Sequence, residues 1–206
     1  MTQKRDDLRV RRTEKLLQEA LIDLVAERGF EAISVGDIAE RAMINRSTFY
    51  RHYQDKYDLV EKISKQAIEI LRGDLGPPGE DAQNTDPLNP PERWVKLFEH
   101  FAKHERLYGA LLGRHGSSWF MARMRDQVFD LIEEREQLRD NIALQKHRPR
   151  QTKMPLKVAI TLASTLFVQT VAWWLESGRE YSAEQIAGWF LEIAVNGYVD
   201  ALGLKR

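Results

Sequence analysis

The chain has 206 residues, and its 31 lysines and arginines are balanced by 31 aspartates and glutamates, so the formal net charge is zero. It contains no cysteine, which excludes a disulfide scaffold, a cysteine-ligated metal site and a cysteine nucleophile. Hydrophobic residues make up 43% of the chain and charged residues 30%, as is typical of a globular protein with a buried core. Zero net charge does not exclude nucleic-acid binding, because a local basic patch can be offset by acids elsewhere.

The sequence predicts a cytoplasmic protein. The N-terminal run MTQKRDDLRVRRTEK is not followed by the apolar segment that a secretory signal needs. The longest nearly apolar stretch, residues 160–175, is shorter than the roughly 20 residues of a membrane span and contains Gln169. We expect it to be a buried helix.

Apolar residues recur three and four positions apart along most of the chain, without sustained two-residue alternation, which predicts an all-α fold of about nine helices. The first should end at Gly29, Ser34 with Asp37 should cap the second, Asn45 the third and Asp55 the fourth. These first helices are predicted at about 9–28, from 34 onward, at 46–52 and at 55–72.

Residues 73–91 hold five of the seven prolines, few apolar residues and an acidic excess, so we expect a flexible loop there. Five further helices are predicted beyond it, over about residues 92–103, 105–113, 117–146, 153–177 and 182–202. The short helices before the loop carry small inward residues, and the long helices after it carry bulky ones. This contrast predicts an N-terminal module at 1–57 and a larger helical domain at 58–206.

Three short helices within about 45 residues, the last two separated by a tight turn, are typical of a helix-turn-helix. In the third helix Phe49 can face the core. The side chains left facing outward, whose donors and acceptors suit base edges and phosphates, are Arg46, Ser47, Thr48, Tyr50, Arg51 and His52. Lys56 follows in the first turn of the next helix, where it can help to hold a phosphate. The competing interpretation is the solvated polar face of an ordinary short helix.

The run from residue 13 to residue 60 resembles the DNA-binding domain of the TetR/AcrR family of bacterial transcriptional repressors. The matching pieces are AERGF at 26–30, DIAERA at 37–42 and TFYRHY-x-x-K at 48–56. The resemblance implies a homodimer that binds a palindromic operator in double-stranded DNA. It also implies that a small-molecule effector, bound in the C-terminal domain, releases the protein from its operator.

The resemblance also implies roles for individual residues. Phosphate contacts are implied for Ser34, Tyr50, Tyr53 and Lys56, base contacts for Arg46, Ser47, Thr48 and His52, and either kind for Arg51. Two positions depart from the family pattern. Met43 occupies the turn where glycine is common, and since a positive φ costs a non-glycine residue roughly 1 kcal/mol, we expect a reshaped turn. Gly36 stands where a basic or polar contact residue is common, so one operator contact is in doubt.

In the C-terminal half, residues 98–126 and 173–190 resemble a domain common in regulators related to dihydroxyacetone-kinase operon activators. Repression is the expectation for the family, and this second resemblance leaves activation open. Nine apolar residues are candidates to line an effector cavity, or alternatively to fill the core: Phe98, Phe101, Leu112, Phe120, Met124, Phe129, Phe167, Val171 and Trp174.

The last two predicted helices are candidates for the dimer interface. The apolar band of the final helix, with small members that permit close packing, comprises Ile186, Trp189, Phe190, Ile193, Ala194 and Gly197. Two such helices from each subunit could form an intermolecular four-helix bundle. The alternative is that both pack wholly within one subunit.

Other chemistry has little support in the sequence. His100 and His104 are four residues apart, but only one carboxylate lies nearby and no HExxH pattern occurs, so we expect no metal. Ser117 and Ser118 lack a GxSxG motif, and no phosphate-binding glycine pattern is present, so we expect no enzyme and no cofactor. An alternative function is a helical small-molecule or protein-binding module whose helix-turn-helix is vestigial, which Met43 and Gly36 would favour.

Overall fold

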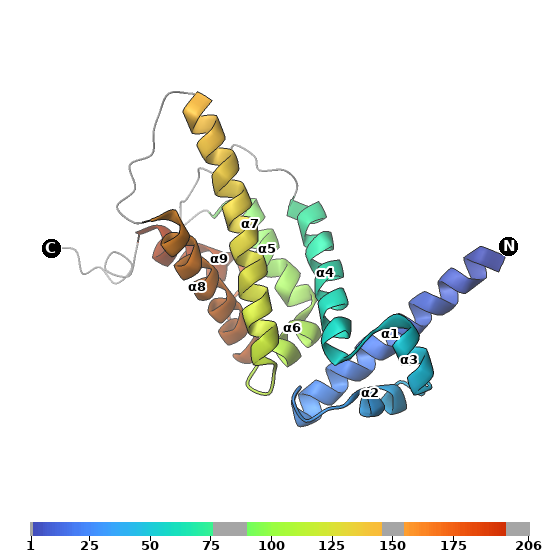
Figure 1. Ribbon diagram of the computed structural model, residues 1–206. Helices are drawn as coiled ribbons and strands as arrows, with labels where there is room; N and C mark the ends of the chain where they lie inside the picture. The colour runs from blue at the N-terminus through green and yellow to red at the C-terminus, as the bar shows by residue number, and fades with distance from the viewer. Residues whose placement is uncertain (1, 76–89, 146–154, 197–206) are drawn as a thin grey trace. The chain divides into compact units, whose positions relative to one another are not determined.

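The computed structural model describes residues 2–75, 90–145 and 155–196, and these form nine α-helices, a short π-helix and no strand (Figure 1). The all-α prediction is therefore confirmed. The helices are α1 (Thr2–Arg28), α2 (Val35–Arg41), α3 (Arg46–His52), α4 (Lys56–Leu75), α5 (Glu92–Lys103), α6 (Glu105–Leu112), α7 (Ser118–Gln145), α8 (Leu156–Glu176) and α9 (Ala183–Leu191), followed by the π-helix η2 (Glu192–Asn196).

The helix ends agree closely with the predicted ones, apart from two differences. α1 begins at Thr2, seven residues before the predicted start at 9. α9 ends at Leu191 and continues as η2, and the rest of the predicted helix, from residue 197, lies outside the described residues. The predicted loop at 73–91 overlaps the end of α4, and its residues 76–89 also lie outside the described part of the chain.

The chain divides into two compact units that differ from the predicted domains 1–57 and 58–206. Unit 1 comprises residues 1–74 and 104–120, and unit 2 comprises residues 75–103 and 121–206. α6 belongs to unit 1 because it packs against α1, where a guanidinium nitrogen of Arg106 lies 2.6 Å from a carboxylate oxygen of Asp23. The helix-turn-helix thus shares its unit with α4, α6 and the start of α7.

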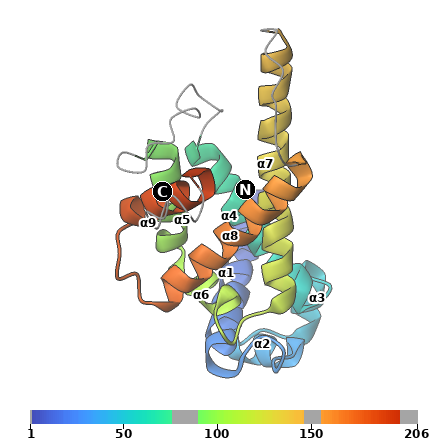
Figure 2. The same cartoon turned by 90° about the vertical axis from the view of Figure 1, so that its left-hand side faces the viewer.

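Unit 1 is built around the apolar stripe of α1. α2 packs across α1, and α3 packs on α2 (Figure 2). The fully or almost fully buried side chains of this core include Leu17, Leu21, Leu24, Val25, Phe30, Ile38, Phe49 and Leu59. α1 ends at Arg28, and the next residue, Gly29, has a φ of 80° that turns the chain toward the loop before α2, so glycine stops the helix as predicted.

The turn between α2 and α3 keeps the left-handed conformation that usually calls for glycine. Met43 has a φ of 54°, its N–H donates to the Glu40 carbonyl at 3.0 Å, and the Ile44 N–H donates to the Ala39 carbonyl at 2.9 Å. This pair of hydrogen bonds is a Schellman motif with methionine in the glycine position. The expectation of a reshaped turn was therefore wrong: the hydrogen bonds and the burial of Ile38 beside them hold the backbone in place despite the strain.

Unit 2 has an aromatic core in which α5 packs on α8 and α9. The ring of Phe98 lies 5.5 Å from that of Phe167 and 5.8 Å from that of Trp174, and Phe167 lies 5.5 Å from Phe190. By length and composition α8 is apolar enough to cross a membrane, but eight of its residues are buried, as in the core helix of a folded domain.

The strain at Met43 predicts a gain in stability when glycine replaces it. Because the Met43 side chain is 91% exposed, its removal costs little packing, and the backbone term dominates. Met43→Gly should exceed Met43→Ala by about 1 kcal/mol in the free energy of unfolding, measured by urea denaturation followed by circular dichroism. Alanine is the matched control, since it also lacks the side chain but keeps the strain. Equal stability of the two variants would show that the turn is unstrained.

Candidate nucleic-acid interface

α3 is a seven-residue helix whose two ends are fixed by short-range hydrogen bonds. The side chain of Asn45 accepts a hydrogen bond from the Ser47 N–H at 2.8 Å, which makes Asn45 the N-cap, as predicted. At the other end the Tyr53 N–H donates to the Phe49 carbonyl at 2.9 Å. Phe49 is fully buried and anchors the helix to unit 1, so the opposite side of α3 faces solvent.

The outward side of α3 carries four exposed side chains: Arg46, Ser47, Tyr50 and Arg51. Their spacing of one and four residues places them on one face of the helix. Arg51 donates to the Thr48 hydroxyl at 2.9 Å, and Thr48 and His52 are half-buried at the side of this face. Arg46 makes no hydrogen bond or ion pair with any other residue that the structure describes. Its guanidinium donors are thus available to a ligand.

Tyr53 lies in the core of unit 1 and is only 6% exposed. Its ring contacts that of Phe49 at 5.6 Å, and the ammonium of Lys62 lies 4.9 Å from its centroid. Burial raises the pKa of the Tyr53 phenol to about 12. The structure therefore gives Tyr53 a packing role beneath α3, and the phosphate contact that the resemblance implied stays a prediction.

Lys56 points its ammonium group back into unit 1. The group donates to the backbone carbonyls of Phe30 at 2.8 Å, Ile33 at 3.0 Å and Glu31 at 3.4 Å, and it lies 4.6 Å from the centroid of the Phe30 ring. Three acceptors match the three N–H donors of an ammonium. Lys56 thus fixes the loop between α1 and α2, a role that the sequence did not reveal because these carbonyls lie more than 20 positions away in the chain.

Ser34 begins α2 through the predicted capping box. Its hydroxyl accepts from the Asp37 N–H at 3.2 Å, and its own N–H donates to the Asp37 carboxylate at 2.7 Å. The hydrogen bonds from Ser34, and the positive charge of Arg28 nearby, lower the pKa of Asp37. Ser34 is exposed, so its hydroxyl can also approach a phosphate.

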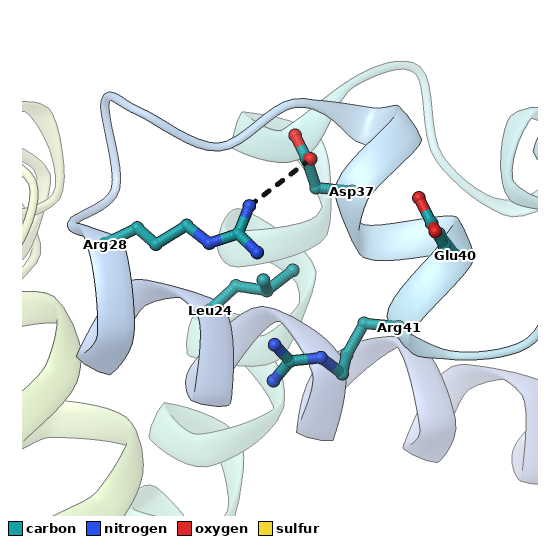
Figure 3. Close-up of a pocket in the computed structure, with 5 residues that line it drawn as sticks. All are labelled: Leu24, Arg28, Asp37, Glu40 and Arg41. Carbon is teal, nitrogen blue, oxygen red and sulfur yellow. Dashed lines mark ion pairs between the residues drawn. The ribbon is translucent and has the colours of Figure 1, made fainter.

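A shallow pocket of about 430 Å³ lies between α1 and α2 (Figure 3). Its lining residues are Leu24, Arg28, Asp37, Glu40 and Arg41. Its charges are largely paired: Arg28 lies 3.6 Å from Asp37, and Arg41 donates to both carboxylate oxygens of Glu27 at 2.8 and 2.6 Å. These ion pairs hold α2 against α1, and hydrogen bonding from Arg41 lowers the pKa of Glu27.

Fewer basic side chains of the helix-turn-helix face solvent without a partner than the sequence suggests. Arg41 is paired with Glu27, and Lys56 is directed inward, so Arg46 and Arg51 supply the charge on the exposed face of α3. Further exposed basic side chains follow the N-terminal part of α1, at Arg9, Arg11, Arg12 and Lys15. The candidate interface is thus a small basic face on a unit whose positive and negative charges nearly balance.

The nine cavity candidates are divided between the two units. Leu112 and Phe120 belong to unit 1, and the other seven belong to unit 2. Eight of the nine are buried and Phe129 is half-buried. Direct ring contacts among Phe98, Phe101 and Phe167 support the interpretation that these residues fill the core of unit 2.

The dimer candidates also separate into two groups. Ile186 and Phe190 are buried, and the ring of Phe190 packs on those of Trp94 and Phe98. Trp189, Ile193 and Ala194 are exposed, whereas Gly197 lies outside the described residues. The sequence could not separate them because α9 is apolar on more than one side, and only its packing on α5 shows which side is covered.

Histidines do not gather into a metal site in the described ranges. His100 belongs to unit 2, whereas His104 and His115 belong to unit 1. Among the residues that the structure describes, no group of three or more potential metal ligands lies together.

This architecture, a helix-turn-helix unit followed by a helical C-terminal region, defines a class of bacterial DNA-binding regulators. Residues 17–63 match the family described as bacterial regulatory proteins, tetR family, and residues 89–196 match the transcriptional regulator C-terminal region. The chain belongs to the TetR family of transcriptional regulators.

Among curated relatives, the transcriptional repressor KstR2 of Mycolicibacterium smegmatis is 28% identical over 95% of this chain and 94% of its own length. Other matches are local. The chain spans only 19% of the regulator YxbF of Bacillus subtilis, at 38% identity over 34% of this chain. It spans 33% of DhaS, the dhaKLM operon transcriptional activator of Lactococcus lactis, at 37% identity over 30% of this chain.

Solved structures show the same fold. A TetR transcriptional regulator from Streptococcus agalactiae aligns with a TM-score of 0.62 and 22% identity, over 92% of this chain and 97% of that one. FadR from Bacillus subtilis, solved in complex with stearoyl-CoA, aligns with a TM-score of 0.57 and 18% identity, over 89% of this chain and 98% of that one.

The inward contacts of Lys56 predict that its removal destabilises unit 1. Lys56→Ala should lower the free energy of unfolding by about 1–3 kcal/mol, because three carbonyls lose a charged donor. Lys65→Ala on the same helix is the matched control: Lys65 only pairs with Glu61 on the surface, and its loss should cost less than about 0.5 kcal/mol. Urea denaturation measures both. Equal effects would mean that the carbonyl contacts contribute nothing.

Proposed function

We propose that this TetR-family regulator binds a palindromic operator in double-stranded DNA as a homodimer, with α3 in the major groove. The observation that carries the proposal is the exposed face of α3, where Arg46 offers guanidinium donors that no other described residue engages. Arginine bidentate to guanine is the commonest specific contact in the major groove. A dimer would place its two recognition helices about 34–36 Å apart, one turn of B-DNA.

The polar side chains of α3, together with Ser34 at the start of α2, divide into two proposed roles. Arg46, Ser47, Thr48 and His52 are proposed to read or approach bases. Tyr50, at 59% exposure, and Ser34 at the start of α2 are proposed to contact phosphates, and Arg51 either. Because α3 carries only two exposed basic side chains, Arg46 and Arg51, non-specific affinity should be modest, and binding should depend on two half-sites engaged together.

Apolar side chains on the last helices support the proposed homodimer. Large apolar residues left exposed in one chain are Val158, Leu162 and Trp173 of α8, Trp189 of α9 and Ile193 of η2. Exposed apolar surface of this kind is typical of a protein–protein interface. Two helices from each subunit would bury it in a four-helix arrangement.

We infer a cytoplasmic repressor without catalytic activity of its own. Repression is favoured by KstR2, a repressor that matches over nearly its full length, whereas the activator DhaS matches over a third of its length. A small-molecule effector bound in the C-terminal part would shift the protein toward a conformation in which the recognition helices no longer match the operator spacing. The stearoyl-CoA bound to FadR makes that thioester a suitable first probe.

Selection from a randomised duplex library tests the DNA-binding proposal directly. The purified full chain should enrich an inverted repeat at low salt, and its affinity should fall as salt rises. Failure to enrich any sequence would favour the second candidate function, a helical binding module with a vestigial helix-turn-helix.

Substitutions on α3 should change sequence preference more than general affinity. Arg46→Ala or His52→Ala should reduce discrimination at particular base pairs by about 1–3 kcal/mol, measured by competition among single-base variants of the selected duplex. The exposed α4 variant Lys65→Ala is the control and should leave the preference unchanged. An equal loss of affinity on every sequence would contradict the base-reading assignment.

The proposed homodimer can be tested by introducing one charged side chain into its apolar interface. Ile193→Glu should raise the dimer dissociation constant at least about tenfold, because it places a carboxylate in the proposed apolar interface. Ile70→Glu on α4 removes an equally large apolar residue of similar exposure, 49% against 40%, and should leave association unchanged. Sedimentation velocity measures both, and equal dissociation would place the interface elsewhere.

A further inference from the structure

The side chain of Arg46 lies directly over the backbone of Gly36 in the neighbouring helix α2. A Cβ atom at position 36 would lie 2.2 Å from Nη2 of Arg46, 2.8 Å from its Cζ and 3.1 Å from its Nε. The first two distances are far shorter than a van der Waals contact between heavy atoms. Any side chain at position 36 would therefore displace the guanidinium.

The place that the Arg46 guanidinium occupies, and not the backbone conformation, is what distinguishes glycine from other residues here. Gly36 lies in the first turn of α2, and its φ is not in the left-handed region, unlike those of Gly29 and Gly178. Alanine could adopt the same helical backbone and would stabilise the helix. The absence of a side chain at position 36 therefore matters for Arg46, whereas α2 itself has no need of it.

No other described contact fixes the Arg46 side chain. It is exposed, and it forms no hydrogen bond or ion pair with the described residues. One side of its guanidinium rests on the Gly36 backbone, and its N–H donors remain available. With glycine at position 36 the guanidinium can lie over α2, whereas a larger residue there would move it and its N–H donors.

We propose that Gly36 is a specificity-determining residue that acts through Arg46: its bare backbone is the platform that orients the guanidinium for base recognition. Gly36 is thus a positioning residue, and the two residues on α2 and α3 act as one recognition element. This inference rests on the proposed DNA-binding function. It explains how a position without a side chain contributes to sequence preference.

A double-mutant cycle tests the coupling. Gly36→Ala, Arg46→Ala and the double variant are compared with the wild-type chain on the duplex enriched from the randomised library and on its single-base variants. Gly36→Ala should reduce discrimination at the base pair read by Arg46 by on the order of tenfold. It should have no further effect when Arg46 is already alanine.

Gly109→Ala is the matched control for the gain in helix propensity. Gly109 lies within α6 of unit 1, and an added Cβ there would meet nothing within 4 Å. Both alanine variants should melt at or above the wild-type temperature. Only Gly36→Ala should change discrimination. An unchanged preference in Gly36→Ala, or a loss that persists in the Arg46→Ala background, would overturn the proposal.

A measurement without DNA separates this inference from the proposed function. The side-chain Nε–H signal of Arg46, assigned by its loss in Arg46→Ala, should shift in the NMR spectrum of Gly36→Ala and stay unchanged in Gly109→Ala. If the wild-type chain enriches no sequence, the proposed DNA binding fails, and this signal still decides the positioning. An Arg46 signal that does not respond to Gly36→Ala would overturn the platform role by itself.

Discussion

The ammonium group of Lys56 connects the start of α4 to the loop that leads into the helix-turn-helix. It joins the first turn of α4 to three carbonyls of the loop between α1 and α2, over distances of 2.8 to 3.4 Å. That loop sets where α2 begins, since the capping box of Ser34 follows Ile33 directly. α3 packs on α2. The inward-directed ammonium of Lys56 thus helps to position the loop that leads into α2 and α3. A charge in such a place is stabilising because every N–H donor finds an acceptor.

This role changes how the charge of the unit contributes to function. A basic residue near a recognition helix is readily assigned a phosphate contact from the sequence. In the structure, however, Lys56 donates to backbone carbonyls within unit 1, and Arg41 donates to Glu27. The positive charge on the exposed face of α3 then comes from Arg46 and Arg51. Under the proposed DNA-binding function, non-specific affinity would depend on these two arginines and on the exposed basic side chains of α1, because it grows with the number of phosphates neutralised.

The sequence predicted what is encoded locally and missed what depends on distant partners. The caps at Ser34, Asn45 and Asp55 were correct because their hydrogen bonds span two or three residues. The inward direction of Lys56 and the burial of Phe190 depend on segments far away in the chain, for which residue spacing carries no signal. The apolar pattern of α9 likewise predicted that the helix is covered, but could not say whether α5 or a second subunit covers each side.

The two departures from the family pattern have physical explanations that favour a working motif over a vestigial one. At Met43 the Schellman hydrogen bonds hold the left-handed turn in place, so the connection between α2 and α3 keeps its shape at a cost of roughly 1 kcal/mol. At Gly36 the missing side chain leaves room that the Arg46 guanidinium occupies. The hydrogen bonds at Met43 keep the backbone that connects α2 to α3, and the open space at Gly36 accommodates a guanidinium that no other described residue engages. Neither departure from the family pattern therefore disrupts the arrangement of α2 and α3 on which the proposed DNA binding depends.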